Sequence, residues 1–366
     1  MNEPRGGAKQ RKKPRFLIGM LIYVCLFLIA AAAAIWVLRD YLSAFERSQT
    51  VNYLEEYRTQ QEQHGLTEAC LQALEVADSK IQTREECAQW AAELLAEATY
   101  PKLLNLSNGE KTVYGVRVRG QQVGTLTFTA VKQEHYDLPE WQLSEEQYDF
   151  SAFLSNASVN IPADYRFVVN GVTLDETYIT DAAVPYELLS ECYEHFEDLP
   201  YMVHYESGQF FGDVEIQVLD AGGEVLELEQ LYETRFLDNC DERILGMMEE
   251  FIPVFMEKYV FFSSDLHGLS RMYYSELYPY VLPDSILSIR LRQAFEGFGY
   301  VTPRALKVLS IHTNLVSDLG NDRYLADVIY STEITGQGDP VVTQEHVRVV
   351  ICELNGKLQA EALFVE

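Results

Sequence analysis

The stretch FLIGMLIYVCLFLIAAAAAIWVL, residues 16–38, holds 23 consecutive residues without a charged side chain. A helix rises about 1.5 Å per residue, so this run is long enough to cross a hydrocarbon core of roughly 30 Å. Trp36 and Tyr41 lie at its C-terminal end, where aromatic rings favour the interface between lipid and water. The stretch predicts a single transmembrane helix at 16–38, and the lipid bilayer is the first expected partner.

Cations on the two sides of this run predict its orientation. Residues 1–15 hold six Lys or Arg and one acidic residue, whereas Arg39, Arg47 and Arg58 are the cations within twenty residues on the other side. Positively charged segments next to a span stay in the cytoplasm. We therefore expect 1–15 to be a cytoplasmic basic tail and the C-terminal region to lie outside, on the cell membrane.

A cleaved signal peptide is the alternative to an anchor, because the alanines at 30–34 supply an A-x-A site. The apolar run is longer than a usual signal core, and four more apolar residues follow the alanines, Ile35 to Leu38. These features favour an uncleaved signal-anchor, with cleavage left as the alternative.

Composition and charge limit the class of protein. The chain of 366 residues is 48% hydrophobic and 12% aromatic, which excludes wholesale disorder. Its formal net charge is −28, although its first fifteen residues are basic. An acidic surface of this kind repels nucleic acid and anionic headgroups, so no nucleic-acid partner is expected.

The N-terminal half of the outer region is expected to change from helix to strand. Residues 39–65 contain no Pro and predict a helical stalk that extends the membrane helix. Thr67 and the capping box of Thr83 with Glu86 predict two short helices, and alternating residues at 113–119 and 122–131 predict a β-hairpin. We assign 66–150 to a helix-plus-hairpin domain. Residues 151–236 read as short strands with an Asn170-Gly171 turn, typical of a small β-rich module.

The last third, 237–366, is expected to fold as helices followed by a meander. A long amphipathic helix at 241–262 contains Pro253, and a second helix, capped by Asp284, ends at 295. Four alternating stretches then predict antiparallel strands, at 305–316, 324–335, 343–354 and 357–364.

The order of elements in 240–366, closed by Val349-Val-Ile-Cys-Glu-Leu-Asn-Gly-Lys-Leu, resembles the cone-shaped nuclear transport factor two-like superfamily. The resemblance implies helices packed on a curved antiparallel sheet. Residues 67–143 repeat this order in abbreviated form. The whole layout resembles single-pass envelope proteins of Gram-positive bacteria, by architecture alone.

The same resemblance suggests a ligand pocket. Superfamily members that are enzymes place an acid or a His on the concave sheet face and a hydrogen-bonding Tyr on the helices. Here the matching residues are Tyr259, Tyr273, Tyr274, His312, Asp327 and His346. A His on such a face is more often a hydrogen-bonded core residue than a catalyst.

Signatures of catalysis and of metal binding are weak. The sequence contains no G-x-S-x-G, Walker, G-x-G-x-x-G or H-E-x-x-H motif. Cys192, His195 and His204 have a spacing that lacks a fourth zinc ligand, and Ser264, Asp265 and His267 lie too close in sequence for triad geometry. We therefore predict no catalytic residues, no metal and no cofactor.

Cysteine spacing leaves one pairing open. Five cysteines follow the apolar run, and an odd number at wide spacing is not a dense disulfide framework. Cys70 and Cys87 lie on neighbouring predicted helices and are the candidate disulfide, and buried free thiols are the alternative.

The sequence thus predicts an α+β multidomain protein: a transmembrane helix, a helix-plus-hairpin domain, a small β-rich module and a C-terminal cone. We expect a membrane-anchored extracytoplasmic protein of the cell envelope, used for binding or assembly with other envelope proteins and without catalytic activity. The alternatives are a small-ligand receptor or enzyme that uses the cone, and an accessory subunit of a secretion or conjugation apparatus.

Overall fold

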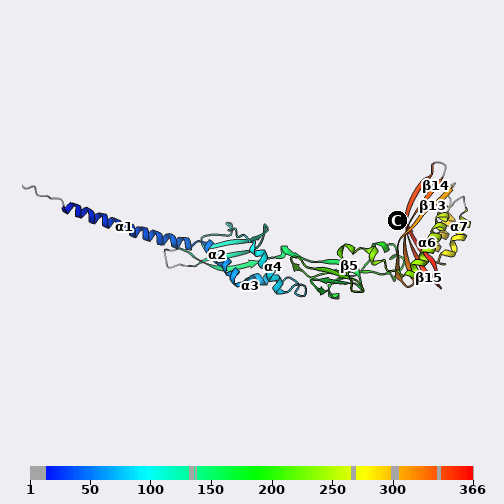
Figure 1. The fold of residues 1–366 in the computed structure, drawn as a ribbon, viewed down its shortest axis with the longest axis horizontal. Helices are drawn as coiled ribbons and strands as arrows, with labels where there is room; N and C mark the ends of the chain where they lie inside the picture. Colours follow the sequence, from blue (N-terminus) through cyan, green and yellow to red (C-terminus); the bar gives the residue numbers. More distant parts are fainter. Residues whose placement is uncertain are drawn as a thin grey trace, which may run out of the picture. The chain divides into compact units, whose positions relative to one another are not determined.

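The computed structural model describes residues 14–131, 136, 138–264, 269–297, 305–335 and 339–365. It is an α+β structure with an N-terminal apolar helix and several antiparallel sheets, as the sequence predicts (Figure 1). The chain divides into two compact units. Unit 1 comprises Met1–Ser155 with Gln209–Gly212, and unit 2 comprises Asn156–Gly208 with Asp213–Glu366. The predicted cytoplasmic tail lies almost wholly outside the described residues.

Helix α1, Pro14–Arg47, contains the apolar run. Its segment Phe16–Arg47 is long and apolar enough to cross a membrane, and the most apolar part of it buries no residue. A proline in the first turn suits a helix start, because its missing N–H has no partner there. Among the described residues this is the one helix that meets the length and composition of a span.

The expected stalk at 39–65 is not a free helix. Helix α1 ends at Arg47, and α2, Thr50–His64, begins after the extended residue Gln49. Leu54 and Tyr57, three residues apart on one face of α2, are buried in the core of unit 1. The helix formers of this stretch therefore make a domain helix, because its apolar face has a sheet to pack against.

The rest of unit 1 follows the predicted change from helix to strand. Thr67 caps α3, Glu68–Ala73, and the predicted capping box of Thr83 and Glu86 begins α4, Arg84–Ala96. Three strands form an antiparallel sheet in sequence order: β1, Lys111–Val118; β2, Gln121–Val131; and β3, Glu140–Tyr148. Their inward residues meet the helices in one hydrophobic cluster, in which Val116 and Leu126 are fully buried.

Unit 1 is completed by a short segment from a distant part of the chain. Strand β10, Phe210–Phe211, pairs with β4, Leu154–Ser155. Gln82 holds both backbone groups of Phe211, donating to its carbonyl at 3.0 Å and accepting from its N–H at 2.9 Å. A side chain at Gly212 would place its Cβ 2.8 Å from Trp90, and the φ of Gly212 is +71°. Residues 151–155 and 209–212 of the predicted module 151–236 therefore belong to unit 1.

The β-rich part of unit 2 contains two small sheets, built from seven strands. Asn170 and Gly171 both have positive φ, as the predicted tight turn requires. One sheet has the order β5-β9-β8: Ser158–Pro162, Met202–Glu206 and Ile179–Val184. The other has the order β12-β11-β6-β7: Val225–Leu226, Ile216–Leu219, Arg166–Val169 and Val172–Thr173.

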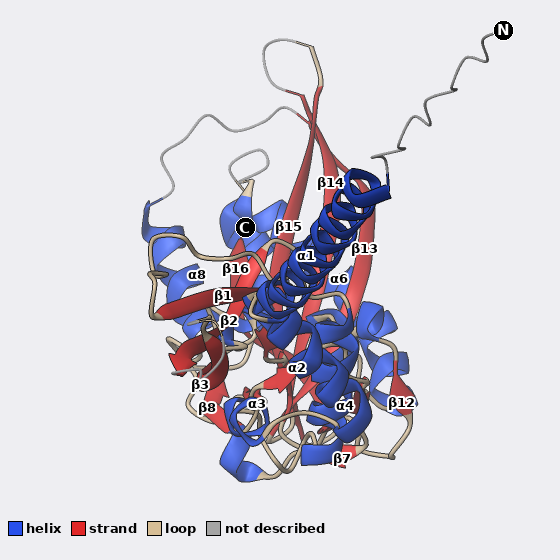
Figure 2. Cartoon of the chain, turned by 90° about the vertical axis from the view of Figure 1, so that its left-hand side faces the viewer, coloured by secondary structure: helices blue, strands red, loops and turns tan. Residues whose placement is uncertain are grey.

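The C-terminal part of unit 2 has the predicted helices and four-stranded antiparallel meander, in the order β13-β14-β15-β16 (Figures 1 and 2). Ser285 rather than Asp284 caps α8, because the Ser285 hydroxyl accepts from the N–H of Ser288 at 3.1 Å and Asp284 has a positive φ. The helices are α5, Glu233–Phe236; α6, Glu242–Ser263; α7, Ser270–Leu277; and α8, Ile286–Gly297. The strands are β13, Ala305–Gly320; β14, Arg323–Thr335; β15, Val341–Leu354; and β16, Lys357–Val365.

Helix α6 supplies most of the helical side of this core. Its residues Ile244, Met248 and Phe255 are fully buried and recur at helical spacing. They pack against alternate residues of β14, among them Ala326 and Val328. Because side chains alternate along a strand, one face of the sheet is covered by the helices and the other is turned away from them.

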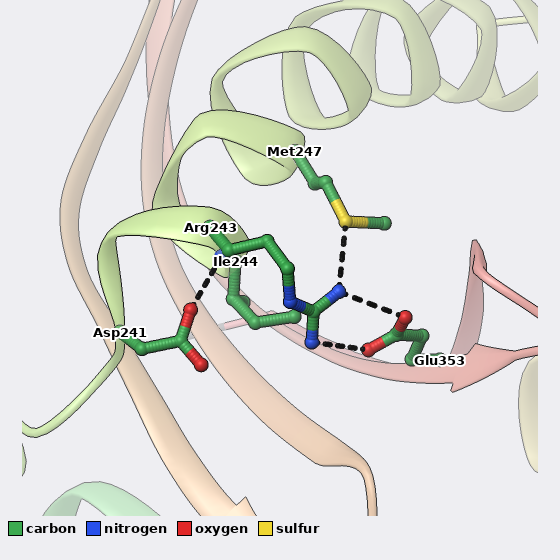
Figure 3. Close-up of polar contacts among 5 residues, drawn as sticks. All are labelled: Asp241, Arg243, Ile244, Met247 and Glu353. Atoms are coloured by element: carbon green, nitrogen blue, oxygen red, sulfur yellow. Dashed lines mark hydrogen bonds and ion pairs between the residues drawn. The ribbon is translucent and has the colours of Figure 1, made fainter.

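The first turn of α6 is tied to the end of β15 (Figure 3). Asp241 accepts from the N–H of Ile244 at 2.9 Å and so caps the helix. Arg243 donates to both carboxylate oxygens of Glu353 at 3.0 Å, and this ion pair lowers the pKa of Glu353. The ion pair therefore stabilises the fold fully at pH values above the ordinary pKa of a glutamate. Its contribution to stability is lost as the pH falls through the lowered pKa of Glu353.

We expect Arg243→Met to raise the pKa of Glu353 back towards the ordinary range of a glutamate, because the hydrogen bonds to its charged form are removed. An NMR titration of the labelled glutamate carboxyls would measure this. Lys258→Met is the matched control, since it breaks the separate Lys258–Glu276 pair and should leave Glu353 unchanged. An unaltered Glu353 titration in Arg243→Met would contradict the assignment.

Candidate functional site

The six residues predicted to line one pocket lie on two sides of the C-terminal sheet. Tyr259, Tyr273 and Tyr274 pack on the helical side. His312 and His346 both pair with Ile329 across neighbouring strands, and Asp327 is two residues before Ile329. Since Ala326 and Val328 face the helices, the alternate positions 327 and 329 face away. We call this second side the outer face; it carries both histidines and the acid.

The three tyrosines belong to the packing of the helices. The ring of Tyr273 stacks on Phe261 at 5.5 Å, and Tyr274 lies 5.9 Å from Phe262, so both join α7 to α6. Tyr259 lines a hollow of about 330 Å³ with Ser263 and Arg290, and burial raises the pKa of its hydroxyl. The three tyrosines thus belong to the packed helical side of the sheet.

Asp327 is the centre of a hydrogen-bonded group on the outer face. It is 7% exposed. One carboxylate oxygen lies 2.5 Å from Nε2 of His346, and the other accepts from Nδ2 of Asn314 at 3.0 Å. Asn314 is the extra residue of a β-bulge in β13, between Thr313 and Leu315. The bulge turns its amide towards Asp327, which a regular strand would not do.

The hydrogen-bonded group around Asp327 lies at the edge of the part of the outer face that is covered by other residues of unit 2. Next to it, Leu325 and Val350 are fully buried, and residues near 196 lie over the same face. The guanidinium of Arg323 lies 5.0 Å from the ring of Phe196, and the His195 ring stacks on Phe364 at 5.7 Å. Asp327 is in the last covered row. The next row carries His312, which is exposed and hydrogen-bonds to neither Asp327 nor His346 in any described contact.

A groove of about 490 Å³ runs beside Asn314, along the edge strand β13. It is bounded by Arg235, Asp238, the α6 residues Leu245 and Glu249, and 313–316. The edge itself is poorly suited to pairing with another strand. Bulges interrupt β13 at three points, and the side chain of Asn239 bonds both backbone groups of Asp318, at 2.8 and 3.2 Å. The groove therefore suits a side chain or a small polar molecule better than an added strand.

The chemistry of this group is that of an oriented imidazole. A carboxylate that holds one ring nitrogen fixes the orientation of a histidine, as in general-base sites. In the described part of the chain, no cluster of three or more His, Cys, Asp or Glu is placed to hold a metal ion. His204 bonds Asn160 at 2.6 Å and His195 stacks on Phe364, so the Cys192, His195 and His204 spacing does not assemble a site. Asp265 and His267 lie outside the described residues.

The candidate disulfide is not formed. Cys70 and Cys87 are both free and buried in the core of unit 1. Burial, with a smaller contribution from Glu146, raises the pKa of Cys70 to about 12. Because the thiolate is the reactive form, such a thiol is protected both by its pKa and by its inaccessibility.

We expect Cys70 to resist alkylation in the folded protein and to react fully in denaturant. N-ethylmaleimide labelling near pH 8 followed by peptide mass spectrometry would measure this. Cys240, which is only partly buried, is the internal control and should label faster. An oxidised Cys70–Cys87 peptide from protein purified without reductant would contradict the free-thiol state.

Asn314 was not among the residues predicted from sequence. A bulge that moves one side chain to the opposite face leaves only a polar residue between Thr313 and Leu315 as its signal in the sequence. Arg348, which pairs with Asp327 in register and is buried, was also missed. Its position next to the acid depends on strand register, which the sequence does not give.

Comparisons with known proteins add little. No protein-family model matches the chain, and no curated protein sequence matches it. A solved structure described as an "Ntf2 like protein involved in plasmid conjugation" aligns with 79% of this chain and 84% of its own, at 8% identity and a TM-score of 0.24. A TM-score that low does not establish a shared fold.

Proposed function

We propose that this chain is a membrane-anchored protein of the cell envelope that holds its outer units at the membrane surface for binding and assembly, without catalysing a reaction. The observation that supports the proposal is the attachment of α1 to the rest of unit 1. Past the apolar run, Asp40 accepts from the hydroxyl of Tyr136 at 2.8 Å, and Trp141 donates to the carbonyl of Ser48 at 2.9 Å. Just beyond, Thr50 bonds Tyr114 at 2.7 Å.

These contacts favour an assembly role. A flexible tether is enough to keep a protein at a membrane, but it does not fix how the protein stands there. A helix hydrogen-bonded to the folded unit that follows it does fix that unit relative to the span. Such an arrangement suits a part that must meet integral-membrane partners at a set height.

The anchor and its orientation can be tested together. We expect the full chain to stay in the membrane after carbonate extraction, with a mass that includes residues 16–38. In intact cells, external protease should degrade the C-terminal region and spare a tag at the N-terminus. A variant that begins at residue 39 should become soluble. A secreted product that starts near Ala34 would refute the anchor and support the signal-peptide alternative.

The assembly role is tested by repeated capture of partners. Cross-linking in membranes, followed by purification of the full chain, should recover the same integral-membrane proteins in independent preparations. Recovery of a secretion or conjugation apparatus would place the chain as an accessory subunit of that apparatus. Recovery of lipid alone would contradict the assembly role.

The groove beside Asn314 supports the second candidate, a small-ligand receptor. A ligand held there would contact 313–316 and α6. It should slow hydrogen exchange in 313–316 and raise the melting temperature of the parent protein. Leu245→Trp would fill the groove and abolish both effects, whereas exposed Val254→Trp on the same helix should preserve them. The assembly role expects no small molecule to produce these effects.

A further inference from the structure

The ring of Tyr136 lies at the level where α1 would leave a bilayer. Tyr41 follows the last residue of the apolar run, Leu38, by three positions, which is about 4.5 Å along a helix. The Tyr136 ring lies 5.5 Å from the Tyr41 ring in an edge-to-face arrangement, and its hydroxyl donates to Asp40 at 2.8 Å. Tyr136 comes from the connection between β2 and β3, and it therefore reaches this level from the folded domain.

An apolar hollow lies between α1 and Tyr136. It has a volume of about 510 Å³ and is lined by Ala33, Ala34, Val37, Leu38, Tyr41 and Tyr136. Four of these six residues belong to the apolar run itself. The hollow is thus continuous with the surface that would face lipid, and Tyr136 forms its domain-side wall.

We propose that Tyr136 is a second membrane contact, which sits at the boundary between headgroups and acyl chains of the bilayer that α1 crosses, with lipid filling the hollow. This inference rests on the proposed anchor. A tyrosine suits that depth because its ring is apolar and its hydroxyl is polar. Trp36, Tyr41 and Tyr136 then form one aromatic belt, in which the first two residues come from α1 and the third from the connection between β2 and β3.

Charge indicates which lipid fits. The chain carries a formal net charge of −28, and Asp40 lies in contact with Tyr136. Anionic headgroups would be repelled, whereas a zwitterionic headgroup brings no net charge to the site. The contact is therefore expected in phosphatidylcholine vesicles without any anionic lipid.

Tryptophan quenching in such vesicles tests the depth of position 136. In the full chain with Trp36→Phe, we would add Tyr136→Trp and compare its emission with that of the Trp36→Phe background. Phosphatidylcholine brominated near the headgroup end of its acyl chains should remove most of the added emission. Phosphatidylcholine brominated near the terminal methyl should remove much less. The matched control is Val76→Trp in the same background.

Val76 is 55% exposed and follows α3, beyond the far end of α2. Helix α2 has 15 residues, about 22 Å of helix, so position 76 should lie out of reach of lipid and its added emission should persist. Equal emission of Tyr136→Trp in brominated and unbrominated vesicles would overturn the inference. Strong quenching of both added tryptophans would overturn it too, because the contact would not be specific to position 136.

The anchor is checked in the same samples by mass and by carbonate extraction. A chain that has lost residues 16–38, or that leaves the vesicles, refutes the proposed function. A chain that keeps its span while position 136 stays unquenched refutes only the second contact. The two failures are therefore distinguishable.

Discussion

Replacing Phe211 with Ala is expected to lower the free energy of unfolding of unit 1 by about 3–5 kcal/mol, the usual cost of truncating a buried phenylalanine. Phe211 is 1% exposed and stacks on Trp90 at 4.6 Å, with Phe150 edge-on at 6.3 Å. The truncation would leave a cavity among these rings. It would also loosen the strand that Gln82 holds through the backbone of Phe211.

Tryptophan fluorescence reports this loss selectively. The three tryptophans are Trp36, Trp90 and Trp141, so none belongs to unit 2. Denaturant unfolding of the full chain in mild detergent, followed by tryptophan emission, should show an earlier transition for Phe211→Ala. The control is Leu104→Ala, since Leu104 is 78% exposed and its truncation should change the free energy by less than about 0.5 kcal/mol. A variant with the parent's midpoint and slope would show that 209–212 does not belong to unit 1.

The second large effect is expected in unit 2, from Phe255→Ala. Phe255 is fully buried in α6 and lies between the rings of Phe251, at 5.6 Å, and Tyr259, at 6.2 Å. Its removal should cost about 3–5 kcal/mol for the same reason. Because the side chain packs against the sheet core, the loss should appear in the C-terminal part and not in unit 1.

The neighbouring residue supplies the control for this variant. Val254 lies on the same helix but is 39% exposed, so Val254→Ala should stay within about 0.5 kcal/mol of the parent. Hydrogen exchange of peptides from 242–263 would separate the two: protection should fall in Phe255→Ala and stay unchanged in Val254→Ala. Equal protection in both variants would mean that the aromatic row on α6 does not hold the C-terminal core together.

The hydrogen-bonded group on the outer face of the C-terminal sheet allows both a structural and a functional interpretation. Asp327 is buried at the rim of the covered area and holds both His346 and Asn314. This arrangement secures three strands to one another, which a structural brace requires. It also lies beside the groove, because Asn314 lines the groove and bonds Asp327. The receptor alternative depends on that shared residue, and the assembly role does not.

Local patterns in the sequence were enough for much of the fold. A helix over the apolar run 16–38, the capping box of Thr83 and Glu86, and the turn at Asn170-Gly171 each occur in the structure. So does the antiparallel meander of the last third. These features depend on residues close together in sequence, through helix length, cap hydrogen bonds, positive φ and period-two alternation.

Other features depended on contacts between distant parts of the chain. Residues 50–64 became a core helix and not a stalk because Leu54 and Tyr57 found a sheet to cover, and Phe211 joined unit 1 through Trp90 and Gln82. The predicted pocket divided because strand register, with the bulge at Asn314, decided which face each side chain meets. A shift of one residue reverses that face, and single-sequence patterns do not fix register.

The apolar run at 16–38 shows the same difference between what local sequence determines and what tertiary contacts decide. Its length and its lack of charge determine, from sequence alone, that this segment is long and apolar enough to cross a membrane. The cations before it predict a cytoplasmic N-terminus. Only the tertiary structure brings Tyr136 from the β2–β3 connection to Asp40 and Tyr41 at its end. The physical reason is that burial and charge along one segment are local properties, whereas a contact across 96 residues exists only once the sheet between them has folded.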